Sequence, residues 1–158
     1  MKSKSGFTMV EILVVIAIFA ILSAIAIPNY FSYRPLHRAR GAARQLFTEL
    51  HYAKMKAVSE NKKFQIQYDA SNDTYSIYCD DDHDGTPEKL CKTIHIRENY
   101  PNIEISSVTN AQSPPITRFY PNGLSKSDYV TKVKIRPVGD ASREQVVAVS
   151  STGRIKMN

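Results

Sequence analysis

The sequence predicts an α+β fold in which one long N-terminal helix packs against an antiparallel β-sheet. Residues 7–27 are almost entirely apolar, residues 36–57 repeat apolar side chains at helical spacing, and the chain beyond residue 61 alternates with a period of two. The chain has 158 residues, of which 42% are hydrophobic and 23% are charged. This balance is typical of one folded domain and excludes a disordered tail, a collagen-like repeat and a multi-pass transporter.

The first expected element is the apolar segment 7–27, which follows the basic leader 1–6 and ends before Pro28. As a helix it spans roughly 30 Å, the thickness of the hydrocarbon core of a bilayer. A secretory signal peptide is one alternative, because a small-residue site resembling a cleavage signal ends at Ala26. The length of the segment and the presence of Glu11 inside it favour a retained membrane helix.

Glu11 is the only acidic residue of the apolar segment. A carboxylate at the centre of a bilayer costs about 2.5–3.5 kcal/mol on insertion scales, and less near the interface. No Lys, Arg or His occurs between Lys4 and Arg34, so no side chain of the segment can neutralise it. A chain cut after Gly6 would carry a positive amine on Phe7, one helical turn away. We therefore expect Glu11 of one copy to pair with the amine of a neighbouring copy and to set the register between the two helices.

The run from Gly6 to Glu11, with the apolar segment behind it and Pro28 at its end, resembles the signature of type IV prepilins. Type IV pilins and type II secretion pseudopilins share this signature. The resemblance implies a type IV pilin-like fold. It also implies that a prepilin peptidase cleaves between Gly6 and Phe7 and methylates the Phe7 amine, and that Glu11 and Pro28 serve filament assembly.

The same resemblance implies a location and a set of partners. The chain would be a single-pass protein of the bacterial inner membrane with a periplasmic C-terminal domain, and would then enter a pilus or pseudopilus. Its partners would be the prepilin peptidase, membrane lipid, the assembly platform of the inner membrane, and other minor and major pilins or pseudopilins. The signature does not separate a pilus from a secretion pseudopilus.

An amphipathic helix is expected to continue from residue 28 to residue 60. Its apolar side chains recur at spacings of three and four, which keeps them on one face: Leu36, Ala39, Ala43, Leu46, Leu50, Ala53 and Ala57. We expect a bend at Pro28, because the proline ring removes a backbone hydrogen bond. Gly41 is a second weak point, and Asn61 a plausible end.

The remaining residues, 61–158, are predicted to form the periplasmic β-rich domain. Their alternation of apolar and polar side chains is typical of half-buried antiparallel strands. Strands are expected at 64–68, 75–79, 94–96, 103–108, 116–120, 130–136, 145–150 and 154–157. Turn residues separate several of them: Ser71–Asp73, Pro114–Pro115, Asn122–Gly123, Gly139–Asp140 and Thr152–Gly153.

Cys79 and Cys91 are the only cysteines, and they enclose a polar stretch. In an exported domain such a pair predicts a disulfide, worth roughly 3 kcal/mol for a loop of this size. Two free buried thiols are the alternative. A metal site built on these two cysteines would lack further ligands at fixed spacing.

Inside that stretch, the pattern Asp80-x-Asp82-x-Asp84 followed by glycine has the spacing of a calcium loop. Thr86 could add a carbonyl oxygen and Glu88 a further oxygen. The loop is not an EF-hand, because a cysteine stands where the bidentate glutamate belongs and no helices flank it. An acidic, solvated turn is the alternative. We expect no required cofactor, and Ca²⁺ is the one ion that the spacing favours.

The C-terminal segment 146–156, with residues 119–123 and the helix end at 53–61, resembles the GspH/FimT family of minor pilins and pseudopilins. Some members of that family bind DNA for natural transformation through a Gly-Arg-x-Arg stretch. Gly153–Lys156 matches it, except that Lys156 replaces the second arginine and loses bidentate geometry while Arg154 is kept. Five further cations could enlarge a basic patch: Arg118, Lys132, Lys134, Arg136 and Arg143. An ordinary charged strand end is favoured over a DNA site, because no aromatic residues are interleaved.

The sequence contains no Ser/His/Asp, Cys/His or glycine-rich phosphate-binding arrangement. We therefore expect a structural subunit, a minor pilin or minor pseudopilin, and not an enzyme. A filament-borne DNA receptor is the alternative function. A plain periplasmic domain released by cleavage after Ala26 is a third.

Overall fold

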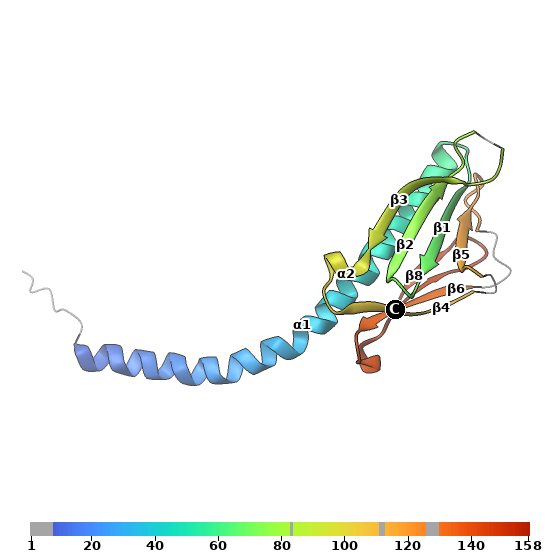
Figure 1. Ribbon diagram of the computed structural model, residues 1–158. Helices are drawn as coiled ribbons and strands as arrows, with labels where there is room; N and C mark the ends of the chain where they lie inside the picture. The colour runs from blue at the N-terminus through green and yellow to red at the C-terminus, as the bar shows by residue number, and fades with distance from the viewer. Residues whose placement is uncertain (1–7, 83, 111–112, 126–129) are drawn as a thin grey trace, which may run out of the picture. The chain divides into compact units, whose positions relative to one another are not determined.

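Figure 1 shows the computed structural model, in which residues 8–82, 84–110, 113–125 and 130–158 are described. At residues 28–29 and 31–32 only the backbone is described. The chain divides into two compact units, Met1–Arg34 and Pro35–Asn158. The described part of the first unit is mostly helical, and the second contains the rest of that helix and all of the described strands.

Helix α1 (Met9–Ser59) confirms the predicted long helix, and Asn61 follows it in the left-handed conformation, with φ of 52°. Asparagine is one of the few residues that adopt this conformation readily at a helix end. The backbone is helical at Pro28, while the bend expected there stays a prediction. Gly41 has a packing role instead, because a Cβ at this position would lie 2.7 Å from the ring of Tyr100.

The strands form two four-stranded antiparallel sheets, whereas the sequence predicted one. The first sheet has the order β3-β2-β1-β5 and the second β4-β6-β7-β8. An alternating pattern shows which face of a strand is buried but not which strands pair. It therefore could not predict the division of the strands into two sheets. The first sheet contains β1 (Phe64–Asp69), β2 (Thr74–Cys79), β3 (Lys89–His95) and β5 (Ile116–Phe119). The second contains β4 (Ile103–Thr109), β6 (Thr131–Pro137), β7 (Gln145–Val149) and β8 (Ile155–Met157).

Two short helices connect the strands. Helix α2 (Ile96–Asn99) follows β3, and the 3₁₀ helix η1 (Ala141–Arg143) lies between β6 and β7. Strand β3 begins at Lys89, earlier than predicted. It is an edge strand that is exposed on both faces, and Ile94 is its one buried residue. Its sequence therefore lacks the alternation by which a half-buried strand is found.

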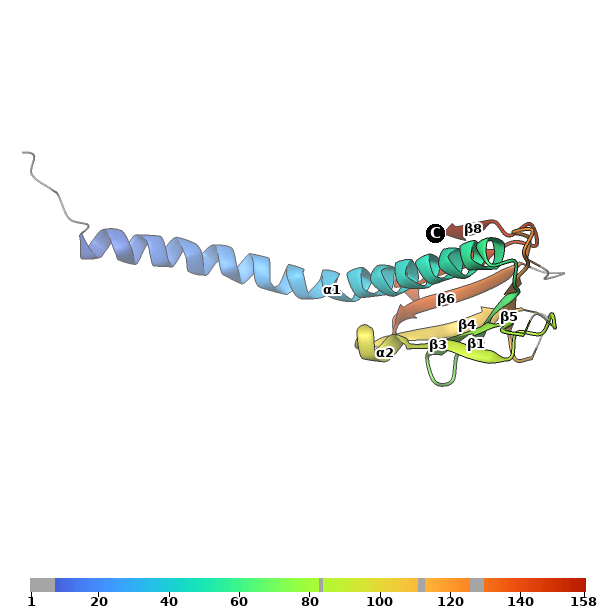
Figure 2. The same cartoon turned by 90° about the horizontal axis from the view of Figure 1, so that it is seen from above.

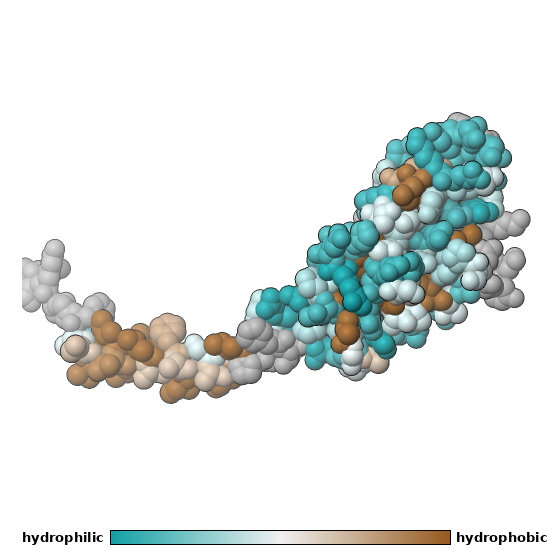
Figure 3. Space-filling view, viewed as in Figure 1, coloured by the Kyte–Doolittle hydropathy of each residue, from teal (hydrophilic) through white to brown (hydrophobic). Residues whose placement is uncertain are grey.

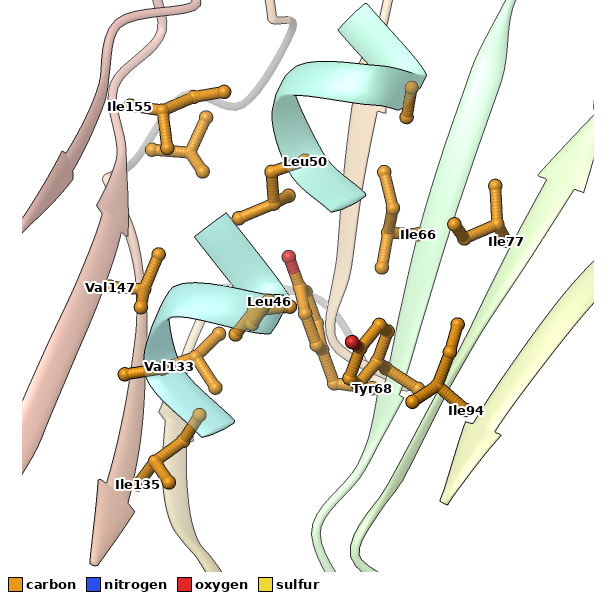
Figure 4. Packing of buried hydrophobic residues seen from close by; sticks show 14 of the residues in the cluster. Leu46, Leu50, Ile66, Tyr68, Ile77, Ile94, Val133, Ile135, Val147 and Ile155 are labelled. Carbon is orange, nitrogen blue, oxygen red and sulfur yellow. The ribbon is translucent and has the colours of Figure 1, made fainter. Parts of the chain in front are cut away.

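The core of the second unit lies between the buried stripe of α1 and the inner faces of both sheets (Figures 2 and 4). Leu46 and Leu50 are fully buried, with side chains of the first sheet on one side and of the second on the other. Burying one leucine side chain contributes about 1.5–3 kcal/mol. Four alanines of the stripe are also fully buried, and their small side chains let both sheets approach the helix: Ala39, Ala43, Ala53 and Ala57.

Asp73 connects the β1–β2 turn to helix α2 and to strand β4 through hydrogen bonds and an ion pair. Its side chain is 3% exposed; Oδ1 accepts a hydrogen bond from the Ile105 amide at 2.6 Å, and Oδ2 lies 2.5 Å from Nε of Arg97. Its carbonyl oxygen accepts a hydrogen bond from the Ile96 amide at 2.9 Å. The sequence identified Asp73 as a turn residue only.

The turns at Gly123 and Gly153 contact each other. Gly153 has a φ of +73°, and a Cβ added there would overlap the carbonyl oxygen of Gly123. The Ser125 amide donates to the Ser151 carbonyl at 3.2 Å, and Nζ of Lys54 on α1 donates to the Gly153 carbonyl at 2.9 Å. Helix α1 and both turns are thereby joined at one end of the second unit.

Candidate functional site

The first candidate site is the N-terminal part of α1. Its side chains from Met9 to Ile27 are all exposed in the single chain, and the face of this helix seen in Figure 3 is mostly apolar. Within the described residues, this is the one helical stretch that is long and apolar enough to cross a membrane. An apolar helix that buries nothing within its own chain needs lipid or other apolar helices around it.

Glu11 lies in the first turn of this helix and forms a capping box with Thr8. The Thr8 amide donates to Oε2 of Glu11 at 3.5 Å, and the Glu11 amide donates to Oγ1 of Thr8 at 3.3 Å. This reciprocal arrangement satisfies backbone donors that the first turn of a helix leaves free. The capping role of Glu11 was not predicted from the sequence, although a threonine three residues before a glutamate is the signature of a capping box.

Other residues of the predicted assembly site are not placed. Gly6 and Phe7, between which cleavage is expected, lie outside the described residues, and so does the side chain of Pro28. Glu11 is therefore the one member of the predicted processing and assembly set whose side-chain contacts are known.

The second candidate site is the connection between β2 and β3. Cys79 at the end of β2 and Cys91 in β3 form a disulfide across a Cα–Cα distance of 6.1 Å, which confirms the predicted pairing. One carboxylate oxygen from each of Asp80, Asp82 and Asp84 lies within 4.8 Å of the others.

Of the other two predicted calcium ligands, Glu88 is not in this group of converging carboxylates, and the carbonyl oxygen of Thr86 stays a prediction. Thr86 and Glu88 are both exposed. The Thr86 amide donates to Oδ1 of Asp84 at 2.6 Å, which orders the turn. The structure therefore brings together three of the four predicted carboxylates.

The third candidate site is the outer face of the second sheet, where Arg154 and Lys156 are exposed. They line a shallow hollow of about 370 Å³ together with Val130, Ala148, Ser150 and Thr152. Lys132, Ala148 and Lys156 are partners in register across β6, β7 and β8, so their side chains share this face.

Four of the cations proposed to enlarge the patch have polar or acidic partners. Lys134 pairs with Glu144 at 2.9 Å, and Arg136 pairs with Glu104 at 2.8 Å. Arg143 pairs with Asp140 at 3.2 Å, and Arg118 donates to Gln65 at 2.5 Å. Among the described residues, Lys132, Arg154 and Lys156 take part in no ion pair. The basic patch is smaller than the sequence suggested.

Curated relatives match about half of the chain. A fimbrial protein of Pseudomonas aeruginosa is 34% identical over 77 residues, which is 49% of each chain. The type IV wide pilus major component PilA4 of Thermus thermophilus is 34% identical over 76 residues, which is 48% of this chain and 49% of that one. The chain thus covers about half the length of these relatives.

Solved structures share the fold over most of the chain. The minor pilin FimU of Pseudomonas aeruginosa superposes with a TM-score of 0.59 at 19% identity, covering 77% of this chain and 89% of that one. The minor pseudopilin EpsH of Vibrio cholerae gives 0.61 at 12% identity, covering 77% and 96%.

Two family models match the chain itself. The prokaryotic N-terminal methylation motif matches residues 1–27, and the type II transport protein GspH family matches residues 42–153. The family and the fold are those of structural pilin and pseudopilin subunits, not of enzymes. Because its family model covers most of the globular part, the chain belongs to the GspH family.

Proposed function

We propose that the chain is a minor subunit of a type IV pilus or a type II secretion pseudopilus, anchored by α1 before assembly and held in the filament by the same helix. The observation that carries this proposal is the exposed apolar helix Met9–Ile27 with a single carboxylate, Glu11, in its first turn. The family implies association with other pilins or pseudopilins in a filament.

The helix is suited to both environments. Lipid tails and the apolar helices of neighbouring subunits cover its surface equally well, so moving from one to the other involves little hydrophobic free energy. The direction of assembly must then be set by other interactions. The only formal charge on the described helix before Arg34 is on Glu11.

Processing supplies the positive charge with which Glu11 can pair. In our proposal a prepilin peptidase removes residues 1–6 and methylates the new amine of Phe7, which keeps its positive charge. Glu11 of one subunit then pairs with the Phe7 amine of a neighbour. An ion pair in an apolar surrounding is strong only when both partners are present, so it selects one register between the helices.

The proposal assigns each part of the chain a place. Residues 7–27 cross the inner membrane, residues 28–60 continue the helix, and residues 61–158 lie in the periplasm, where they contact the assembly platform and other subunits. The disulfide Cys79–Cys91 supports a location outside the cytoplasm, because structural disulfides are rare in the reducing cytosol.

The experiment that tests this function separates the charge of Glu11 from its capping role. Glu11→Gln keeps a side chain that completes a capping box but removes the charge. Thr8→Ala removes half of the capping box and keeps the charge. We expect Glu11→Gln to insert into the membrane normally and to be lost from sheared filaments, while Thr8→Ala is incorporated at near wild-type levels.

The opposite outcomes decide against the proposal. Wild-type incorporation of Glu11→Gln would show that the charge has no part in assembly. Mass spectrometry of the mature chain gives an independent result: an N-methylated Phe7 at the N-terminus supports processing, and a chain that begins at Ile27 means cleavage of a signal peptide.

A second candidate function is DNA binding by the outer face of the second sheet, favoured by the described cations Lys132, Arg154 and Lys156, which have no described acidic partner. Loss of two phosphate contacts reduces the magnitude of the negative slope of log K, the logarithm of the binding constant, against log salt concentration by about 2. We expect this change for the double variant Arg154→Ala/Lys156→Ala. The matched control is Lys134→Ala, which removes a cation already neutralised by Glu144. Equal effects of both variants would exclude the site.

A further inference from the structure

Asp80 is a buried acid with an unsatisfied oxygen. The residue is 3% exposed, and its Oδ2 accepts a hydrogen bond from the Gly85 amide at 3.0 Å. Its Oδ1 is buried and has no hydrogen-bond partner among the described residues. A carboxylate oxygen that has lost its water without gaining a donor or a cation is strongly destabilising. Oδ1 of Asp80 is therefore a buried acceptor for which the described residues supply no donor.

Two further carboxylates converge beside it. One oxygen from each of Asp80, Asp82 and Asp84 lies within 4.8 Å of the others. Ligand oxygens of Ca²⁺ lie 2.3–2.6 Å from the ion, so two of them are separated by at most about 5 Å. The three carboxylates are thus close enough to share one such ion.

Three lysines contact this loop, but their described partners are Asp81 and Gly85 and not the three converging carboxylates. Lys89 pairs with Asp81 at 2.7 Å, and Lys62 lies 3.9 Å from the same carboxylate. Lys63 donates to the Gly85 carbonyl at 2.8 Å. In the part of the chain that the structure describes, no ion pair includes Asp80, Asp82 or Asp84. Three like charges that lie this close repel one another, and a divalent cation bound between them would replace the repulsion by attraction.

We infer that the β2–β3 connection is a calcium-binding site with Asp80, Asp82 and Asp84 as its carboxylate ligands. The donors are hard oxygens, which suit Ca²⁺, and backbone carbonyls and water complete its six to eight ligands. Magnesium fits less well, because it requires a near-ideal octahedron at shorter distances. Gly85, with a φ of +89°, makes the sharp turn that closes the loop, and the disulfide limits the entropy lost when an ion orders it.

The affinity should match calcium concentrations outside the cytoplasm, with a Kd of about 10⁻⁴–10⁻³ M. The test is isothermal titration of the oxidised full chain, purified in detergent, with CaCl₂ and separately with MgCl₂. We expect one Ca²⁺ per chain and Mg²⁺ binding that is about tenfold weaker. Asp82→Asn and Asp84→Asn should each weaken Ca²⁺ binding about tenfold or more, because each removes a charged ligand.

Asp81→Asn is the matched control, since it removes one charge from the same loop but no ligand, and it should change the Kd less than about threefold. Asp82 and Asp84 are exposed, so their variants should keep the wild-type near-ultraviolet circular dichroism. Three results would overturn the site: no saturable binding of Ca²⁺, an unchanged Kd in Asp82→Asn, or equal weakening by Asp81→Asn. Binding of Mg²⁺ as tight as that of Ca²⁺ would overturn the assignment to calcium.

Discussion

Gly153 is the position where the fold should tolerate a side chain least. Its φ of +73° is unfavourable for any residue with a Cβ, and a Cβ there would overlap the carbonyl oxygen of Gly123. The obstacle is backbone in another turn, which cannot rotate away as the end of a side chain can. Its own carbonyl also accepts the hydrogen bond from Lys54, so a shift of the turn would break the link to α1.

Gly139 provides the matched comparison. Its φ is +79°, close to that of Gly153, but a Cβ added there meets nothing within 4 Å. Gly139→Ala should therefore cost only the left-handed conformation, about 1–2 kcal/mol. Gly153→Ala should cost that amount plus the overlap, about 1–3 kcal/mol for inserted volume that the surroundings cannot absorb. The effect of alanine on the unfolded chain is similar at both positions, so the difference isolates the turn–turn contact.

The assay is thermal unfolding of the full chain in detergent, followed by the tyrosine signal because the chain has nine tyrosines and no tryptophan. At about 4 °C per kcal/mol, Gly139→Ala should lower the Tm by about 4–8 °C, and Gly153→Ala by about 8–20 °C. Equal shifts for the two variants would show that the contact between the turns at Gly123 and Gly153 adds nothing to stability.

Two other variants test buried chemistry of the same unit. Burial, followed by the negative charge of Glu49, raises the pKa of the Tyr75 hydroxyl above its ordinary value of 10.0, so the folded state loses stability as the pH rises past 10. Tyr75→Phe removes a hydroxyl with no described partner. In thermal unfolding, the Tm of the variant should be at least that of the wild type at pH 7. Between pH 9 and pH 11, the Tm of the variant should fall less than that of the wild type. Replacing Cys79 and Cys91 together by serine should cost about 3 kcal/mol in denaturant unfolding, from the entropy of a loop with a sequence separation of 12; a loss below about 1 kcal/mol would mean that the reduced loop is already ordered.

Local patterns were enough to predict α1 and most of the strands. Leu46 and Leu50 belong to a stripe with helical spacing, and all members of that stripe from Ala39 onwards are buried. Strand β1 alternates buried and half-buried residues along its length, as its sequence indicated. Both features depend on side chains a few residues apart, which a single sequence shows directly.

Contacts between distant segments could not be predicted in the same way. Asp73 bonds to Ile105 and Arg97, and Gly153 touches Gly123, but nothing near either residue in the sequence points to its partner. The division of the strands into two sheets belongs to the same class. In the sequence, a turn glycine or aspartate looks the same whether it stabilises only its own turn or also makes a tertiary contact.

The candidate sites show the same limit. Three carboxylates at spacings of two residues converge because the spacing itself brings them together, so the acidic cluster was visible in the sequence. The basic patch was overestimated because Glu104 and Glu144, which neutralise Arg136 and Lys134, reach them from other segments. Charge counts along a strand do not show counter-charges on its neighbours.

The capping box changes the energetics of the proposed assembly. In the single chain, Glu11 accepts a hydrogen bond from the Thr8 amide, so its carboxylate stabilises the N-terminal end of α1 and gains from the helix dipole. In an unassembled subunit, the Glu11 carboxylate is therefore already stabilised by its place at the start of α1. An amine from a neighbour contributes to assembly only by what it adds beyond that cap. This is why Glu11→Gln, which keeps a capping side chain without the charge, measures the pairing, while Glu11→Ala would combine the loss of the pairing with the loss of the cap.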